Sequence, residues 1–161
     1  MAEKVGILSD SHGQVERTRR AIELLQQAGA TRVIHCGDVE IEEVVDLFAG
    51  LAAHLTWGNC DPAGTLGRYA RSIGVDAQHP SGEVTVDGRR IAFTHGDDER
   101  AVSRALASAP DFLLHGHTHL RRDDTVGTTR VINPGALHRA KPFTVALLEP
   151  ATGALRSIEV S

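Results

Sequence analysis

The chain has few cysteines, few aromatic residues and no excess of positive charge. Only Cys36 and Cys60 are cysteines among 161 residues, which is too few for a disulfide framework or a thiolate zinc site. Aromatic residues make up 4% of the chain and the formal net charge is −4. With neither stacking platforms nor a basic stripe, we expect no general binding of nucleic acid.

Long apolar runs are also missing. No stretch approaches the roughly 18 apolar residues of a membrane span. Residues 4–8 already have the pattern of a strand, which leaves no room for the charged and apolar regions of a secretory leader. We therefore expect no membrane association and a cytoplasmic location. The 161 residues, 41% of them hydrophobic, suit one domain over residues 1–161 with a sizeable core.

The first third of the chain alternates short apolar runs with polar loops and amphipathic stretches. This pattern predicts three βα units, which favour a mostly parallel sheet covered by helices. We expect strands over residues 5–8, 32–35 and 52–57, helices over 14–28 and 40–49, and a short helix that opens at Pro62.

The pattern changes after Gly82. Asp87-Gly88 between two alternating runs is a strong hairpin signal, so we expect an antiparallel portion to begin here. The predicted strands cover residues 83–86, 90–94, 112–114, 129–132, 143–148 and 154–160, with a helix over 99–107 and a polar, mobile loop over 121–128. Two sheets packed face to face with helices outside are the expected result.

Polar side chains follow several of these strands at the point where each strand ends. Strand ends are where the backbone of an α/β protein brings side chains into a shared crevice. His117 and His119 are separated by one residue, and neutral imidazole is the commonest metal ligand in proteins. The residues in such positions are Asp10, His12, Asp38, Asn59, His95, His117 and His119.

Two carboxylates, one amide and four imidazoles are too many for one ion that keeps a water position. They suit two ions that share a bridging carboxylate. Oxygen and nitrogen donors without thiolate favour manganese, iron, zinc or nickel over calcium or magnesium. The residues alone therefore indicate a centre of two divalent metal ions.

The ordered motifs resemble those of the calcineurin-like metallophosphoesterases, in particular the small single-domain YfcE-type phosphodiesterases. The resemblance covers essentially the whole chain. It is carried by Ser9-Asp-Ser-His-Gly13, Gly37-Asp38, Gly58-Asn-Cys-Asp61, His95-Gly96, Gly116-His-Thr-His119 and Asn133-Pro-Gly135.

The resemblance implies an α/β fold, a four-layer α/β/β/α sandwich of two mixed β-sheets flanked by helices. It implies that Asp10, His12 and His119 hold one metal ion. Asn59, His95 and His117 would hold the second, and Asp38 would bridge the two. The implied activity is hydrolysis of a small phosphodiester by a hydroxide that bridges the ions, with Asp38, Asn59 and His95 as catalytic residues. Manganese is the metal we expect first, and iron, zinc or nickel stay open.

The segment Asn59-Cys60-Asp61 departs from larger members of the superfamily, which often have Asn-His-Glu there. That histidine assists the leaving group, so its lack predicts a preference for diesters or activated esters. We expect Cys60, Asp61, His35 and His115 to contact the metal ligands without binding the metal themselves. For His35 and His115, an equal alternative is a hydrogen-bonded histidine of the core with no role in the site. Asn59, His138 and Arg139 are the candidates for binding a substrate phosphate.

Two other functions stay open at this point. The same small fold occurs in a retromer subunit that serves as a protein-interaction scaffold and has lost metal-site residues. A nuclease is the third possibility, although the acidic balance disfavours it. Since all seven ligand types are present here, we favour the enzyme.

Overall fold

Strand β1 (Val5–Leu8) is an interior strand of the first of two β-sheets, and its two faces contact two different layers of the core. Its side chains point alternately to the two faces of the sheet, as in any strand. Val5 and Ile7 enter a core shared with the second sheet, whereas Leu8 enters the core beneath the helices. Gly6 leaves room for Leu25 of the helix Val15–Gln27, because a Cβ at position 6 would lie 2.9 Å from Leu25 Cδ1.

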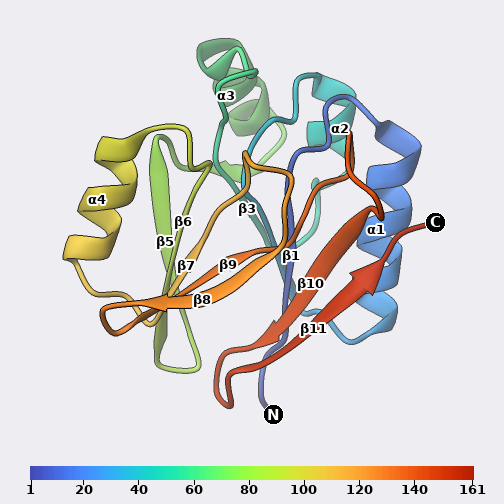
Figure 1. Cartoon of the computed structure of the whole chain (residues 1–161). Coiled ribbons are helices and arrows are strands. Elements are labelled where there is room, and N and C mark those ends of the chain that lie inside the picture. Colours follow the sequence, from blue (N-terminus) through green and yellow to red (C-terminus); the bar gives the residue numbers. More distant parts are fainter.

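The computed structural model describes residues 1–161 and contains eleven strands and four helices (Figure 1). The helices are α1 (Val15–Gln27), α2 (Glu42–Asp46), α3 (Ala63–Ser72) and α4 (Glu99–Ala107). The other strands are β2 (Arg32–His35), β3 (Ala53–Leu55), β4 (Asp76–Ala77), β5 (Ser81–Val86), β6 (Arg89–Thr94), β7 (Phe112–Leu114), β8 (Arg122–Val126), β9 (Thr129–Asn133), β10 (Thr144–Glu149) and β11 (Ala154–Glu159).

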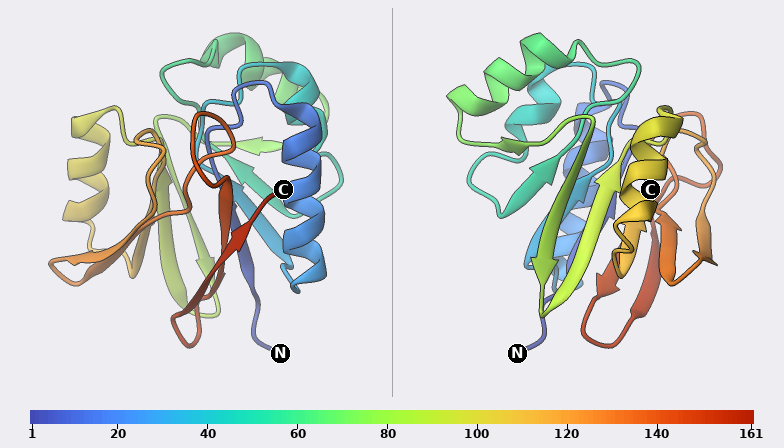
Figure 2. Two further views of the ribbon diagram at one scale, coloured as in Figure 1. Left: turned by 45° about the vertical axis from the view of Figure 1, so that its right-hand side comes forward. Right: turned by 90° about the vertical axis from the view of Figure 1, so that its left-hand side faces the viewer.

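The elements form four layers in the order helix, sheet, sheet, helix (Figure 2). The first sheet has the strand order β11-β10-β1-β2-β3-β4 and the second has the order β5-β6-β7-β9-β8. Three apolar clusters separate the layers. One lies between α1 to α3 and the first sheet, one between the two sheets, and a small one beneath α4. The predicted sandwich of two mixed sheets is confirmed.

The second half of the chain is less antiparallel than the hairpin signal predicts. Strands β5 and β6 do form an antiparallel hairpin, in which Asp87 and Gly88 take φ values of 50° and 75°. Strands β6, β7 and β9, however, pair in parallel. Asp87-Gly88 specifies only the turn that it occupies. The crossover through α4 then returns the chain to the same end of the sheet before β7, which makes that pair parallel.

The predicted polar loop over residues 121–128 is wrong, because most of it is strand β8. Its residues are all exposed, so the sequence shows no alternation of apolar and polar side chains. β8 is an edge strand that pairs antiparallel with β9. Arg130 of β9 also forms an ion pair with Asp123, at 2.8 Å, that joins the two strands.

Two further differences concern length. Strand β4 has only two residues and carries no apolar pattern, so it was not predicted. The predicted helix 40–49 shrinks to α2 (Glu42–Asp46), because Glu40 has a φ of 74° and Ile41 is extended. No helix of the structure is both long enough and apolar enough to cross a bilayer.

Candidate metal centre

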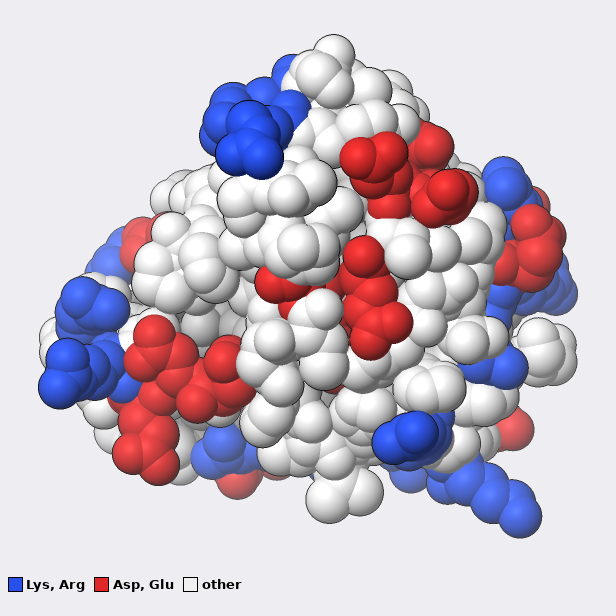
Figure 3. Space-filling model, turned by 90° about the horizontal axis from the view of Figure 1, so that it is seen from above, with Lys and Arg blue, Asp and Glu red and all other residues white.

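The loops that follow β1, β2, β3, β6 and β7 meet at the upper end of the sheets in Figure 1. Parallel strands deliver their carboxyl ends to one edge, and this brings segments that are distant in sequence together. Figure 3 looks onto this face, where acidic side chains gather near the centre and most basic side chains lie toward the margins.

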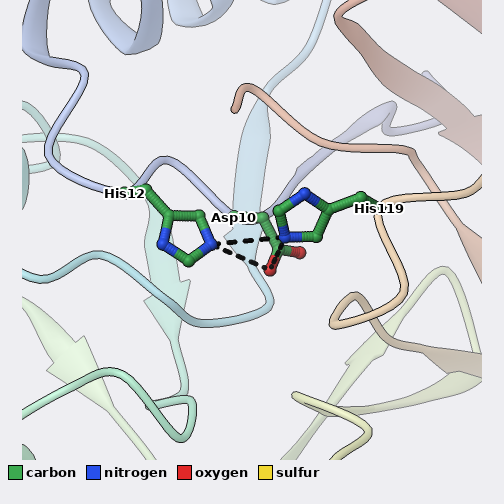
Figure 4. Close-up of side chains that lie close together, drawn as sticks. All are labelled: Asp10, His12 and His119. Atoms are coloured by element: carbon green, nitrogen blue, oxygen red, sulfur yellow. Dashed lines mark hydrogen bonds and ion pairs between the residues drawn. The ribbon is translucent and has the colours of Figure 1, made fainter. Parts of the chain in front are cut away.

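A first cluster consists of Asp10, His12 and His119, which point toward one another (Figure 4). Nε2 of His119 lies 3.2 Å from Oδ1 of Asp10 and 3.3 Å from Nε2 of His12. Nε2 of His12 lies 3.6 Å from the same carboxylate oxygen. The potential ligand atoms of the three residues all lie within 4.8 Å of one another. This arrangement suits a metal ion.

A second cluster consists of Asp38, His95 and His117, and its ligand atoms meet the same 4.8 Å limit. Oδ2 of Asp38 lies 3.1 Å from Nε2 of His95. The same oxygen lies 3.4 Å from Nε2 of His12, in the first cluster. Asp38 therefore stands between the two clusters, where a bridging carboxylate is expected.

Two buried atoms at the junction of the clusters have no hydrogen-bond partner: Oδ1 of Asp10 and Nε2 of His95. They lie 3.9 Å apart. Unpartnered buried polar atoms are rare in folded proteins, and each one calls for an explanation. Nδ1 of His95 lies 2.7 Å from the carbonyl oxygen of Cys36, to which it can only donate. In the neutral ring, Nε2 then presents a lone pair to the Asp38 and Asp10 carboxylates. A cation bound between Oδ1 of Asp10 and Nε2 of His95 would satisfy both atoms, so these residues fit a divalent metal ion.

The charges of the site show the same demand for positive charge. Although burial works to raise it, the pKa of Asp38 falls to about 2, because His95 lies beside it and the Cys60 N–H donates to it. The nearby Asp10 carboxylate and the hydrogen bond to Glu40 outweigh burial and raise the pKa of His12 to about 9. In the metal-free protein, a proton on His12 therefore offsets part of the carboxylate charge at neutral pH.

Five of the candidate ligands have left-handed backbones. A positive φ is uncommon outside glycine and costs roughly 1 kcal/mol or more per residue. Such conformations concentrate at functional sites, where surrounding contacts hold them. The residues and their φ values are Asp10 (56°), His12 (43°), Asp38 (62°), His117 (72°) and His119 (62°).

Gly58 and Gly116 permit close approach between neighbouring loops. A Cβ on Gly58 would lie 2.8 Å from the backbone nitrogen of Asp38 and 2.8 Å from Cδ2 of His95. A Cβ on Gly116 would collide with the side chains of Ser9 and Asp10. Any larger residue at either position would displace a candidate ligand.

Asp61 holds the loops around the second cluster. Its Oδ2 accepts hydrogen bonds from the backbone N–H groups of Asp38 and Gly58, both at 2.8 Å. Its Oδ1 accepts from the N–H of Glu40 at 2.7 Å. Asp61 therefore fixes the turn that presents Asp38.

His35 joins the loops after β1 and β2 from below the site. Its Nδ1 accepts from the Gly37 N–H at 3.0 Å, and its Nε2 lies 2.8 Å from Oγ of Ser11. The ring is fully buried, and burial lowers its pKa to about 4. His35 is thus a hydrogen-bonded core histidine that also positions the loops of Asp10 and Asp38.

The other predicted residues are less closely engaged. Asn59 is exposed, and its side-chain nitrogen lies 3.7 Å from Sγ of Cys60, which is also exposed. The His138 ring lies 5.1 Å from the His12 ring, whereas Arg139 is exposed. His115 is buried, and its ring hydrogen bonds involve Gly116 and Arg122 rather than a candidate ligand.

Sequence reasoning missed three residues that contact the candidate ligands or their loops. Oε1 of Glu40 lies 2.9 Å from Nδ1 of His12. Ser9 donates a hydrogen bond to Oδ2 of Asp10 at 2.7 Å. The side chain of Asn133 donates to the Gly116 carbonyl and to Thr118, both at 3.1 Å. Ser9 and Asn133 lie inside the quoted motifs, whereas nothing in the sequence set Glu40 apart from other surface acids.

Comparison with known proteins gives consistent matches. A model of the calcineurin-like phosphoesterase superfamily domain matches residues 4–153. Phosphodiesterase MJ0936 of Methanocaldococcus jannaschii is 33% identical over 137 residues, which cover 82% of this chain and 82% of that protein. Phosphodiesterase YfcE of Escherichia coli is 26% identical over 150 residues, with 83% and 79% coverage.

Solved structures agree with these matches. The structure of an archaeal phosphodiesterase superposes with a TM-score of 0.85 and 28% identity, covering 98% of this chain and 99% of that one. Vps29 of Entamoeba histolytica, complexed with Zn²⁺, superposes with a TM-score of 0.65 and 20% identity, covering 98% of both chains. At that identity the second likeness concerns the fold alone.

Proposed function

Since the chain belongs to the calcineurin-like phosphoesterase superfamily and is a hydrolase of phosphate esters, we propose that it is a phosphodiesterase with a centre of two divalent metal ions. The observation that carries the proposal is the unpartnered pair Asp10 Oδ1 and His95 Nε2 at the junction of the two clusters. Manganese is the first candidate for both positions, with iron, zinc and nickel as alternatives.

Each candidate ligand has a proposed place. Asp10, His12 and His119 hold one ion through the first cluster, and His95 and His117 hold the other together with Asn59. Asp38 contributes to both, which its position beside His12 and His95 supports. Two divalent ions, when bound, supply an activated water and positive charge for the phosphate oxygens.

The residues of the chain prepare this chemistry. The Cys36 carbonyl fixes the His95 ring so that Nε2 faces the junction, and Ser9 and the His117 N–H anchor the far oxygen of Asp10. Asp38, His95 and Asn59 are the proposed catalytic residues. Asn59 and His138, which stands beside His12, are proposed to contact the phosphate, with Arg139 at the rim.

The proposed substrate is a small phosphodiester and not a polynucleotide. The face in Figure 3 shows acidic side chains near its centre and no continuous basic track, which disfavours a polynucleotide. The scaffold alternative gains no support from the Vps29 likeness, which concerns the fold alone. A cytoplasmic location is proposed with this activity.

The substrate class is tested with manganese-loaded protein on bis-p-nitrophenyl phosphate, p-nitrophenyl phosphate and simple alkyl monoesters. Cys60 stands where a leaving-group histidine occurs in larger relatives, so we expect the aryl diester to be hydrolysed faster than the alkyl monoesters, whose leaving groups are poorer. Faster turnover of alkyl monoesters than of the aryl diester would refute the preference for diesters or activated esters. If no ester were hydrolysed with manganese, nickel, zinc or iron, the proposal of a metal-dependent phosphodiesterase would be refuted.

A further inference from the structure

The His12 ring has two nitrogens in different surroundings. Nε2 faces Asp10, Asp38 and His119, whereas Nδ1 faces outward to Glu40, whose Oε1 is 2.9 Å away. We propose that Glu40 is a positioning residue, which holds His12 in the orientation and tautomer that binds the first metal ion. This inference rests on the proposed function.

The backbone is arranged to bring Glu40 to this place. Its φ of 74° takes the chain out of the helical conformation that the sequence predicts over residues 40–49. The Glu40 N–H donates to Oδ1 of Asp61 at 2.7 Å, which fixes this conformation. The same Asp61 carboxylate also holds the N–H of Asp38. One acidic side chain thereby fixes both Asp38 and the carboxylate that orients His12.

The chemistry of the contact follows from the donor and acceptor roles. A carboxylate only accepts, so Nδ1 of His12 carries the proton and donates to Glu40. When the ring is neutral, the lone pair is then on Nε2 and points at the first cluster. A carboxylate behind a ligating histidine fixes its tautomer and ring orientation and raises its basicity. Without it, rotation of the ring and the other tautomer compete with binding.

A different use of the same residues must be distinguished. The ligand atoms of His12, Glu40 and Cys60 also lie within 4.8 Å of one another. A thiophilic ion bound there would use Nδ1 of His12 and the Cys60 thiolate, and Glu40 would then be a ligand itself. Cys60 separates the alternatives, because positioning of His12 does not need the thiol.

The test is calorimetric titration of metal-free protein with Mn²⁺ and, separately, Zn²⁺. The variants are Glu40→Ala, Glu40→Gln, Cys60→Ala and Glu43→Ala, the last an exposed acid of α2 that serves as the control for lost charge. His119→Ala identifies which binding event belongs to the first cluster. Circular dichroism and thermal melting establish that each variant is folded.

We expect Glu40→Ala to weaken the His119-dependent event by about 10- to 100-fold and to change the other by less than about threefold. Glu40→Gln should recover most of the loss, since its amide oxygen still accepts from Nδ1–H. Cys60→Ala and Glu43→Ala should match the wild type with both metals.

Unchanged affinity in folded Glu40→Ala, or no recovery in Glu40→Gln, would overturn the positioning role. A loss of Zn²⁺ affinity in Cys60→Ala as large as that in Glu40→Ala would assign the cluster to a thiolate site instead. If the wild type bound neither ion, the proposed metal centre itself would fail, which is a separate result.

Discussion

Oδ2 of Asp38 lies 3.1 Å from Nε2 of His95, and the same oxygen lies 3.4 Å from Nε2 of His12. One carboxylate thus touches both histidine clusters, although His12 and His95 come from loops in different sheets. In the proposed centre, this residue belongs to both metal positions.

Replacement of Asp38 should therefore remove both ions. We expect the Asp38→Ala variant to bind neither of the two Mn²⁺ ions at micromolar concentration and to lose essentially all diesterase activity. The control variant Asp124→Ala, at an exposed position, should behave as the wild type. Metal content is measured by elemental analysis after dialysis. Retention of two ions by Asp38→Ala would show that the carboxylate does not bridge.

Metal binding should compete with protons on His12. Its pKa is raised to about 9, so at pH 7 the ring is protonated in the metal-free protein and must lose a proton to become a ligand. Affinity for the first ion should then rise up to about tenfold for each pH unit between pH 7 and 9. Calorimetry in buffers of different ionisation enthalpy would measure the released proton, and pH-independent affinity would contradict the raised pKa.

His35 should make the fold sensitive to acid. Its folded pKa is about 4, against 6.5 for an unperturbed histidine, so between these values the unfolded chain binds a proton that the folded chain does not. Stability is therefore lost as pH falls from about 6.5 to 4, by about 3 kcal/mol in total.

The loss is measured by urea unfolding of metal-free protein across that range. The comparison is with His35→Gln, whose side chain does not titrate. The wild type should lose more stability than the variant as the pH falls, and parallel curves would show that His35 is not the group responsible.

Gly58 and Gly64 form a matched pair for the role of close packing. A Cβ at Gly58 would meet Asp38 and His95, whereas one at Gly64 of α3 would lie 3.8 Å from its nearest neighbour, Nη1 of Arg68. Gly58→Ala should weaken Mn²⁺ binding at least about tenfold by displacing candidate ligands. Gly64→Ala should leave it unchanged and stabilise the helix by up to about 1 kcal/mol. Equal metal affinity in both variants would refute the steric account.

The sequence predicted those parts of the fold whose signals are local. The strand-end motifs of Asp10, Asp38 and His95 and the Asp87-Gly88 turn each report on their own surroundings, and each lies where it was expected. The parallel pairing of β6, β7 and β9 was missed because pairing depends on the crossover through α4 and not on any one segment.

The parts of the site that were missed depend on tertiary contacts. An exposed edge strand such as β8 needs no apolar face, so its polar sequence predicts a loop. Glu40 has the sequence pattern of a helix, but Asp61, 21 residues later, holds it in a left-handed conformation beside His12. No local pattern records such a contact.

The two clusters are proposed to hold two metal ions, both of which hydrolysis requires. The most direct test is to add Mn²⁺ back to metal-stripped protein while both the bound metal and the hydrolysis of bis-p-nitrophenyl phosphate are measured. We predict little activity after one equivalent and full activity at about two, as a two-metal site requires. Full activity at one equivalent, or activity in the stripped protein with no metal bound, would contradict the dinuclear account.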